Sequence, residues 1–383
     1  MINLTNGAFT YGSLAENDYF TNRVAERKKL SSLIQANINT ILISPRRWGK
    51  SSLVKQASSD ISSEFSNYVF CFIDLFDVRS EIEFYEHLAN EIIAKTSSKW
   101  EERIQKVQQF LGKVIPQISL STDATQEFSL SFDRNEAPKN SSQILDLAEE
   151  IAKQQNLKIV ICVDEFQNIS YYEQPLAFQK KLRSHWQTHQ HVTYCLYGSK
   201  RHMMMEVFTS STMPFYKFGE VIFLEKINEE DWIPYIQSRF IATGKQIEVE
   251  SAAKIAQLVE NHPHYVQQLA QQVWFRTDKN CTIQIVETAF KDMILQLNLF
   301  FQATADQLTS TQLNFLSAIL DDVENYSSQE VLKKYRLGTS ANIGRIKQAL
   351  IQKEVLDFLT GSPLFLDPIF KAWLVRDYFK KQN

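Results

Sequence analysis

Residues 43–52 read ISPRRWGKSS, which sets a glycine, a lysine and two serines directly after a short apolar run. A backbone that turns at a glycine and continues into a helix directs several N–H groups at one point, where the helix dipole also favours negative charge. Lys50 adds an ammonium there, and Ser51 adds a hydroxyl suited to a bound Mg²⁺. The segment therefore predicts a phosphate-binding loop made of Ser44, Pro45, Arg46, Arg47, Trp48, Gly49, Lys50, Ser51 and Ser52.

The loop departs from the usual pattern G-x-x-x-x-G-K-[ST] at its first position, where Ser44 stands. The first glycine mainly permits the turn out of the preceding strand. Serine is small and can hydrogen-bond its own backbone, so it can take this position. We therefore expect Ser44 to replace the glycine without removing a phosphate ligand.

A second pair of chemical groups ends the apolar run IVICVDEFQ, much later in the chain. Two carboxylates at the end of a buried strand need a partner for their charge. A magnesium-bound triphosphate would supply one, with Asp164 holding the Mg²⁺ through water and Glu165 polarising the attacking water. The alternative is a solvated strand end with two incidental acids, but the order and spacing of the two motifs favour a nucleotide site.

Five apolar runs could form the strands that position these groups. They span residues 39–44, 67–76, 157–166, 191–199 and 219–227. Helical patterns lie between most of them, and this alternation is typical of a parallel sheet covered by helices. The acid that follows the magnesium aspartate indicates the P-loop branch with an extra strand between the loop strand and the aspartate strand. We predict an α/β fold with a five-stranded parallel P-loop domain over residues 1–227.

The remaining segments fall outside this alternation. Within residues 97–142, QISLSTD and EFSLSFD alternate polar and apolar residues, so we expect an exposed β-hairpin there. Helical patterns then continue over residues 228–244, 249–261, 263–277, 283–307, 309–322, 327–337 and 340–356. We interpret residues 228–305 as a helical lid. The last three helices precede two short strands around a Gly-Ser-Pro turn, which is typical of a winged helix-turn-helix over residues 306–383.

These motifs resemble, over nearly the whole chain, those of the archaeal and bacterial ATPase family related to the AAA+ and STAND ATPases. ISPRRWGKSSL resembles the family's phosphate loop, and VDEFQ matches its acidic motif. Within residues 1–33, DYFTNRVAERKKLSSL resembles a segment that flanks the adenine, which implies this role for Tyr19, Phe20 and Arg23. YGSK resembles the polar tip of the fourth strand, which implies that Ser199 senses the γ-phosphate.

Three further matches depart from the family pattern. PFYKFG resembles a segment that usually carries an arginine, where Lys217 stands here. NHPHYVQQLA resembles the lid motif G-x-P, whose proline packs against the adenine; Pro263 matches, while Asn261 replaces the glycine. In STAND relatives the winged helix can carry a histidine–aspartate pair that reads the nucleotide. FLDP has Asp367 here, but Leu366 at the histidine position.

The resemblance implies ATP or ADP and Mg²⁺ as cofactors, and slow ATP hydrolysis by a nucleotide-controlled switch. The catalytic residues that it implies are Lys50, Glu165, Ser199 and Lys217, and the metal ligands are Ser51 and Asp164. Hydrolysis should be slow because Lys217 is a monodentate substitute for an arginine, and an arginine finger contributes about 10³–10⁵ in rate in GTPases. Arg46 and Arg47 are alternative cations, or they pair with a neighbouring domain.

Two other functions are left open. An ATP-regulated DNA-binding protein would act through the winged helix, whose candidate recognition helix carries Arg345, Lys347 and Lys353. Residues 306–383 hold ten Lys and Arg against nine Asp and Glu, a balance that supports DNA binding only weakly. A nucleotide-binding scaffold without turnover is the other function. A protein partner or self-association is compatible with each.

Composition limits the remaining classes. The net charge of -3 argues against non-specific attraction to nucleic acid or to an anionic membrane. The sequence shows no secretion signal and no apolar run of membrane-spanning length, so we expect a cytoplasmic protein without a membrane partner. The four cysteines are spaced far apart and are expected to be buried, reduced thiols. His185 and His189 share a helical face, but no third metal ligand stands nearby, so we expect an ordinary helix end.

Overall fold

The computed structural model describes residues 7–15, 19–111, 117–120, 128–132, 140–359 and 361–381. Contacts divide the chain into two compact units, which are described separately below. The N-terminal unit is Leu14–Glu225, and the C-terminal unit is Lys226–Asn383 together with Met1–Ser13. No helix among the described residues combines the length and apolar character needed to cross a bilayer.

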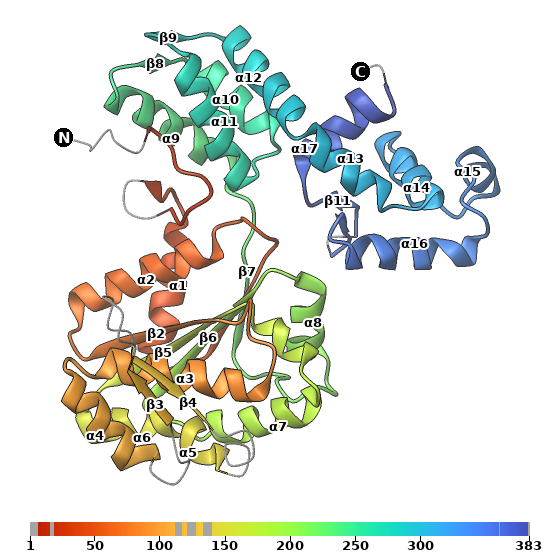
Figure 1. Cartoon of the computed structure of the whole chain (residues 1–383). Coiled ribbons are helices and arrows are strands. Elements are labelled where there is room, and N and C mark those ends of the chain that lie inside the picture. The colour runs from red at the N-terminus through yellow and green to blue at the C-terminus, as the bar shows by residue number, and fades with distance from the viewer. Residues whose placement is uncertain are drawn as a thin grey trace. The chain divides into compact units, whose positions relative to one another are not determined.

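The N-terminal unit is built on one parallel sheet of five strands (Figure 1). The strands are β1 (Thr40–Ile43), β2 (Tyr68–Asp74), β5 (Lys158–Asp164), β6 (Val192–Gly198) and β7 (Glu220–Phe223). Their order is β2-β5-β6-β1-β7, and every neighbouring pair is parallel. Strand β6 lies between the loop strand β1 and the aspartate strand β5, so the expected extra strand is confirmed.

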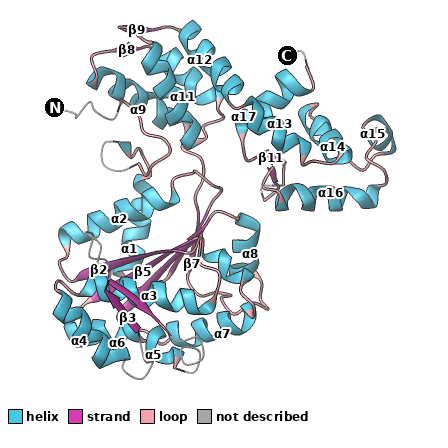
Figure 2. Cartoon of the chain, in the orientation of Figure 1, coloured by secondary structure: helices cyan, strands magenta, loops and turns pink. Residues whose placement is uncertain are grey.

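Helices cover both faces of this sheet, as Figure 2 shows. On one face lie α1 (Val24–Gln35) and α2 (Lys50–Glu64), whose apolar side chains form a core with Leu42. Neighbouring Ile41 and Ile43 belong to the core of the opposite face, as the two-residue repeat of a strand requires. The helices that contribute to that second core include α3 (Glu81–Thr96), α5 (Ser141–Leu145), α6 (Leu147–Gln155), α7 (Pro175–Trp186) and α8 (Arg201–Thr209).

The insertion contains α4 (Trp100–Leu111) and an antiparallel hairpin of β3 (Gln117–Leu120) and β4 (Phe128–Ser131). The side chain of Asn90 on α3 donates to the Leu130 carbonyl at 2.9 Å and accepts from the Leu130 N–H at 2.7 Å. Leu130 is buried in the core of the N-terminal unit. The sequence had suggested an exposed hairpin. Strand β4 is instead buried at Leu130, where the amide side chain of Asn90 serves as its hydrogen-bond partner.

The C-terminal unit is mostly helical and shares one apolar core. Its first part consists of α9 (Glu229–Ala242), β8 (Gln246–Ile247), α10 (Val249–Leu258), α11 (Pro263–Arg276), β9 (Asn280–Cys281) and α12 (Ile283–Gln296). Strands β8 and β9 form a short parallel pair that the sequence did not indicate. The single helix expected over 283–307 is broken at Leu297, where α13 (Asn298–Asp306) begins.

The winged helix follows as expected. It is formed by α14 (Ser310–Leu320), α15 (Gln329–Lys334), α16 (Ser340–Gln352), β10 (Leu356–Asp357), β11 (Leu364–Phe365) and α17 (Pro368–Trp373). Strands β10 and β11 pair antiparallel and form the wing. A π-helical turn, Leu374–Tyr378, continues α17. The four cysteines of the chain are buried free thiols, as predicted.

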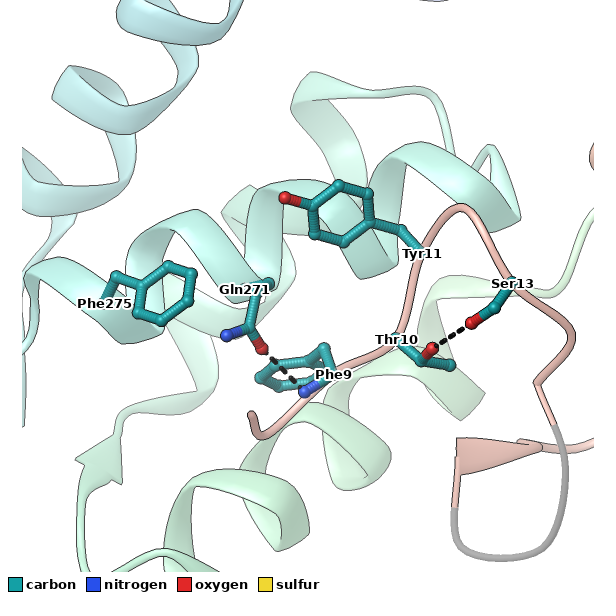
Figure 3. Close-up of a pocket in the computed structure, with 6 residues that line it drawn as sticks. All are labelled: Phe9, Thr10, Tyr11, Ser13, Gln271 and Phe275. Carbon is teal, nitrogen blue, oxygen red and sulfur yellow. Dashed lines mark hydrogen bonds between the residues drawn. The ribbon is translucent and has the colours of Figure 1, made fainter. Parts of the chain in front are cut away.

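Residues 7–13 pack into the C-terminal unit, although the sequence assigned them to the P-loop domain. The Phe9 N–H donates to Gln271 Oε1 at 2.8 Å, and Arg239 Nε donates to the Ala8 carbonyl at 2.7 Å. Figure 3 shows the pocket of about 420 Å³ beside this segment, with the Phe9–Gln271 hydrogen bond dashed. Its lining residues are Phe9, Thr10, Tyr11, Ser13, Gln271 and Phe275. None of the predicted site residues lines this pocket.

Candidate nucleotide site at the carboxyl edge of the sheet

The predicted loop connects the end of β1 at Ile43 to the start of α2 at Lys50. Ser44 is fully buried, and its hydroxyl donates to the Pro45 carbonyl at 3.2 Å. This bond within the loop supports the expectation that a serine can replace the first glycine. Gly49 adopts a φ of 90° at the N-terminus of α2, a left-handed conformation that strains any residue with a side chain.

Lys50 lies across this loop. Its ammonium donates to the Ser44 carbonyl at 3.3 Å and to the Pro45 carbonyl at 3.1 Å, and the residue is buried. An ammonium withdrawn from water needs polar partners. The Lys50 charge is thus held at the mouth of the loop, beside the amino end of α2, where the helix dipole also favours an anion.

Ser51 and Asp164 meet across the gap between α2 and β5. The Ser51 hydroxyl donates to Asp164 Oδ2 at 2.7 Å, and the Glu165 N–H donates to Asp164 Oδ1 at 2.8 Å. Burial raises the pKa of Asp164 to about 6, aided by the nearby Glu165 carboxylate and opposed by the Ser51 hydrogen bond and the Lys50 charge. Burial thus disfavours the ionised form of Asp164, and a bound cation would stabilise that form.

The donor set of Ser51 and Asp164 fits Mg²⁺. Magnesium takes oxygen ligands, keeps several of its waters and commonly binds through one or two carboxylates together with substrate phosphates. Within the described part of the chain, no three His, Cys, Asp or Glu side chains are grouped to hold a metal. One hydroxyl and one carboxylate therefore suit an ion that arrives with a nucleotide better than a resident metal.

Glu165 lies at the same edge and is held by the tip of β6. Its Oε2 accepts from the Ser199 hydroxyl at 2.9 Å, from the Ser199 N–H at 3.4 Å, and from the Gln167 amide. Arg46 Nε lies 3.4 Å from the Ser199 hydroxyl. The structure thus brings Glu165, Ser199 and Arg46 together. Gln167 was overlooked in the sequence, although the motif VDEFQ contains it.

The segment expected to flank an adenine supports the loop. The buried Arg23 guanidinium donates to the Trp48 carbonyl at 3.2 Å and to Glu26 Oε1 at 2.9 Å, and its burial lowers its pKa. Phe20, which follows Tyr19, packs against the core formed with α1 and α2. Arg23 therefore contacts the backbone of the loop directly, a role that the resemblance did not indicate.

Ser52 is also engaged within the protein. Its hydroxyl accepts from the Ala15 N–H at 3.0 Å, and the residue is buried. Ser52 follows Ser51 on α2 but points its oxygen toward the N-terminal segment. Its expected part in nucleotide binding stays a prediction.

The structure does not bring Lys217 to the loop of its own chain. Lys217 precedes β7, whose first residue, Glu220, pairs with Thr40 at the amino end of β1. The loop leaves the opposite end of β1, and four residues of strand span about 13 Å. The Lys217 ammonium lies 5.3 Å from the centre of the Tyr216 ring. Lys217 is therefore not grouped with Lys50, Asp164 and Glu165 in its own chain, and its expected catalytic role stays a prediction. Pro263 begins α11 in the C-terminal unit, and its contact with an adenine stays a prediction.

Two family models match the chain. The model described as "ATPase domain predominantly from Archaea" matches residues 20–215, and the model described as "Probable winged helix domain" matches residues 299–376. The first match contains the loop, Asp164, Glu165 and Ser199. No curated protein matches this chain.

Solved structures share the fold at low sequence identity. The Walker-type ATPase PABY2304 of Pyrococcus abyssi is 14% identical with a TM-score of 0.66, and the alignment covers 96% of this chain and 99% of that one. The Aeropyrum pernix ORC2 protein, in ADPNP–ADP complexes, is 13% identical with a TM-score of 0.56, covering 96% and 98%. The match to the first family model spans more than half of the 383 residues. The chain therefore belongs to the family of ATPase domains found predominantly in Archaea.

Proposed function

We propose that this protein binds ATP together with Mg²⁺ and hydrolyses it slowly to ADP and phosphate, as a nucleotide-controlled switch. The observation that carries the proposal is the Ser51–Asp164 hydrogen bond of 2.7 Å, which joins the loop helix to the acidic strand at the amino end of α2. Lys50 and the loop N–H groups would bind the β- and γ-phosphates. Ser51 and Asp164 would hold the Mg²⁺, which neutralises phosphate charge when bound.

Glu165 is the group proposed to act on the attacking water. Its Oε2 is held by Ser199 and Gln167, which leaves Oε1 as the oxygen to orient the water and accept its proton. Arg46 and Lys50 are cations of this edge, whereas Lys217, which stands at the position of the family's arginine, lies at the other end of the sheet. Slow turnover is expected because the site then lacks the cation that this arginine would supply. Steady-state turnover well above about 10 s⁻¹ would contradict a slow switch, since that is the median for enzymes.

A switch needs a path from the nucleotide to the rest of the protein, and contacts within the C-terminal unit support one. The Tyr265 hydroxyl, two residues after Pro263, donates to Asp367 Oδ2 at 2.5 Å. Lys371 of α17 pairs with Glu260 at 2.7 Å. The lid motif is thus bonded directly to the last helix of the winged helix. A change at the lid would be transmitted to that helix.

Titration calorimetry with ATP and ADP, with and without Mg²⁺, tests the binding step. Lys50→Ala should abolish nucleotide binding, whereas Lys55→Ala on the same helix should preserve it, because the Lys55 ammonium lies over the Phe72 ring. Unchanged ATP affinity in Lys50→Ala would refute the nucleotide site.

Phosphate release tests the chemical step. Glu165→Gln should retain ATP binding and lose turnover, and Glu173→Gln, an exposed acid of the same segment, should hydrolyse ATP like the unmodified protein. If the unmodified protein binds ATP but releases no phosphate, the scaffold without turnover is the correct function. If Glu165→Gln keeps full turnover, another group is the base.

A DNA-binding function through the winged helix is the second candidate, and charge distribution favours it. Residues 331–353 carry six Lys and Arg and no Asp or Glu, so the small net charge of the winged helix conceals a basic segment. Lys333, Lys334, Arg336 and Arg345 in this segment are exposed. Cations grouped around a recognition helix are the electrostatic requirement for phosphate contacts.

Fluorescence anisotropy with a labelled duplex tests this candidate. Binding should weaken steeply with salt, and an Arg345→Ala variant should lower the salt dependence, whereas Lys353→Ala, at the far end of α16, should have a smaller effect. A comparison of ATP-bound and ADP-bound protein would establish whether nucleotide controls the affinity. Binding that is absent, or insensitive to salt, would remove this candidate.

A further inference from the structure

Gln167 is a buried polar residue at the site that the proposed chemistry does not use directly. It lies in the 3₁₀ helix Phe166–Tyr171 that follows Glu165, and its side chain is wholly buried. Its Nε2 donates to Glu165 Oε2, the same oxygen that accepts from both the hydroxyl and the N–H of Ser199. Three donors therefore converge on one carboxylate oxygen.

The other end of this amide is poorly satisfied. Gln167 Oε1 is buried without a hydrogen-bond partner among the described residues. A buried acceptor without a partner costs about 1–3 kcal/mol. An apolar side chain of similar size would avoid this cost, so core packing alone does not explain a glutamine here. The contact with Glu165 does.

Gly198, the last residue of β6, makes room for this glutamine. A Cβ at position 198 would lie 1.9 Å from Gln167 Oε1 and 2.8 Å from Met204 Sδ. The glycine is needed for space, because its φ lies outside the left-handed range that otherwise favours glycine. Ser199, directly after β6, thus binds Glu165, and Gly198 before it leaves the space that the Gln167 side chain occupies.

The backbone of Glu165 adds to the same arrangement. Glu165 adopts a φ of 50° and a ψ of 39°, a left-handed conformation that is uncommon for a residue with a side chain. Its N–H donates to Asp164 Oδ1 at 2.8 Å, which ties this turn to the aspartate of the site. Such backbone strain persists only where surrounding contacts enforce it.

We infer that Gln167 is a positioning residue for ATP hydrolysis, because its amide holds Oε2 of the Glu165 carboxylate. It can do so only because position 198 is a glycine. The inference rests on the proposed function, since it assigns to Glu165 the role of water base. With Oε2 held by Gln167 and Ser199, the carboxylate cannot rotate freely and Oε1 faces the attacking water. In this role Gln167, which is wholly buried, acts through Glu165 and is not itself a catalytic residue.

The first test is Gln167→Met, which keeps the length of the side chain and removes the donor. We expect kcat to fall about tenfold or more, the effect typical of a misplaced catalytic group, with KM and ATP affinity within about twofold of the unmodified protein. The melting temperature should stay equal or rise, because the unpaired carbonyl is removed. A packing role alone would instead leave kcat per folded molecule unchanged, whatever the change in melting temperature.

The outcomes separate this inference from the proposed function. If the unmodified protein hydrolyses ATP, Glu165→Gln is inactive and Gln167→Met retains full kcat, the inference is overturned while the ATPase assignment stands. If the unmodified protein shows no turnover, both are overturned.

A double-mutant cycle tests the part played by Gly198. Gly198→Ala should reduce kcat in the unmodified background, because the new methyl displaces Gln167. In a Gln167→Ala background the same change should cost less, since the methyl enters the vacated space and only the flexible Met204 side chain, 2.8 Å away, has to shift. Gly344→Ala, at a helical glycine of α16 with open space around its Cβ position, is the matched control and should leave kcat unchanged. Equal losses in both backgrounds would show that Gly198 does not act through Gln167.

Discussion

The Ser51 hydroxyl and Asp164 Oδ2 are separated by 113 residues of sequence but by 2.7 Å in the structure. A hydrogen bond between two oxygens that both suit Mg²⁺ occupies the place where an ion would join them. We expect Mg²⁺ to break this bond on binding with a nucleotide and to take both oxygens as direct or water-mediated partners.

Ser51→Ala should therefore weaken ATP binding in the presence of Mg²⁺ by about tenfold, or about 1.4 kcal/mol, and change metal-free binding little. Titration calorimetry with and without Mg²⁺ measures both affinities. Ser63→Ala on the same helix is the control, because its hydroxyl bonds only the helix backbone at Asp60. An equal loss with and without Mg²⁺ would argue against a metal ligand at Ser51.

The raised pKa of Asp164 predicts how binding depends on pH. Burial raises this pKa to about 6, so a proton competes with Mg²⁺ below that pH. Mg²⁺-dependent ATP affinity should fall by up to about tenfold per pH unit below pH 6. The control is Asp164→Asn, whose weaker binding should be flat between pH 5 and pH 7.

The raised pKa of Asp164 affects stability in the opposite direction: a higher pH favours Mg²⁺-dependent binding but lowers the free energy of unfolding. A carboxyl whose folded pKa lies above its unfolded value binds protons more tightly when folded, so stability falls as the pH rises from about 4 to about 6. Asp164→Asn should consequently melt at a higher temperature than the unmodified protein at pH 7.5, and this advantage should vanish near pH 4. Thermal melts at both pH values check this. An Asn variant that is less stable at pH 7.5 would contradict it.

Arg46 should matter more to turnover than Arg47. Both side chains are exposed in the loop, but Arg46 Nε lies 3.4 Å from the Ser199 hydroxyl that binds Glu165. Arg46→Ala should reduce kcat about tenfold, corresponding to about 1.4 kcal/mol of transition-state stabilisation, while Arg47→Ala should cost less. Single-turnover hydrolysis separates this effect from nucleotide release. If the two variants are equally impaired, Arg46 has no special role.

The histidines of α7 and the following turn form hydrogen bonds with acids, and Asp146 contacts both His185 and His189, which the sequence did not indicate. His185 Nδ1 and His189 Nε2 lie 2.7 Å and 3.1 Å from Asp146 Oδ1. Burial alone would raise the pKa of Asp146, but its hydrogen bonds with His189 and His185 outweigh burial and lower that pKa. A lowered folded pKa stabilises the protein above the unfolded pKa, and this contribution disappears as the pH falls below about 4.

Asp146→Asn should therefore lower the melting temperature at pH 7 and make no difference near pH 3. Because the carboxylate is 37% exposed, solvent screening limits the effect to about 1 kcal/mol. Addition of Zn²⁺ should not stabilise the unmodified protein. A large Zn²⁺-induced rise in melting temperature that His189→Ala removes would instead indicate a metal site.

Phe9 should stabilise the C-terminal unit although it lies near the start of the chain. It is 2% exposed and contacts Tyr235 and Phe240 of α9. Phe9→Ala should cost about 3–5 kcal/mol of unfolding free energy, as for other buried phenylalanines. Hydrogen exchange should show the loss in α9 and α11. Tyr11→Ala, at a residue 39% exposed, should cost less than about 1 kcal/mol.

The five strands and the position of the loop could be predicted because local signals mark them. Each strand is a short apolar run, and the charged groups stand where the runs end. The same local reasoning could not find Gln167, whose role depends on the missing side chain of Gly198, 31 positions later in the sequence. The motif around Lys217 likewise gives no information on the end of the sheet at which its loop lies.

Other differences also arise from long-range contacts. The helix break at Leu297 has no proline or glycine to mark it. The burial of Leu130 depends on Asn90, a side chain from a different helix. Residues 7–13 show no apolar periodicity that would assign them to a distant unit. These features follow from partners that are remote in sequence, and a local pattern does not contain them.

The docking of Ala8 and Phe9 has a consequence for protein synthesis. Their hydrogen-bond partners, Arg239 and Gln271, follow 231 and 262 residues later. At 5–20 residues per second the ribosome needs roughly 10–50 s to deliver them, and meanwhile the first residues have no place in the core that they will complete. The segment that holds Ala8 and Phe9 is therefore fixed late, after residues 14–225 have been synthesised. A nascent chain that stops short of α11 would leave the apolar side chain of Phe9 open to chaperones and proteases.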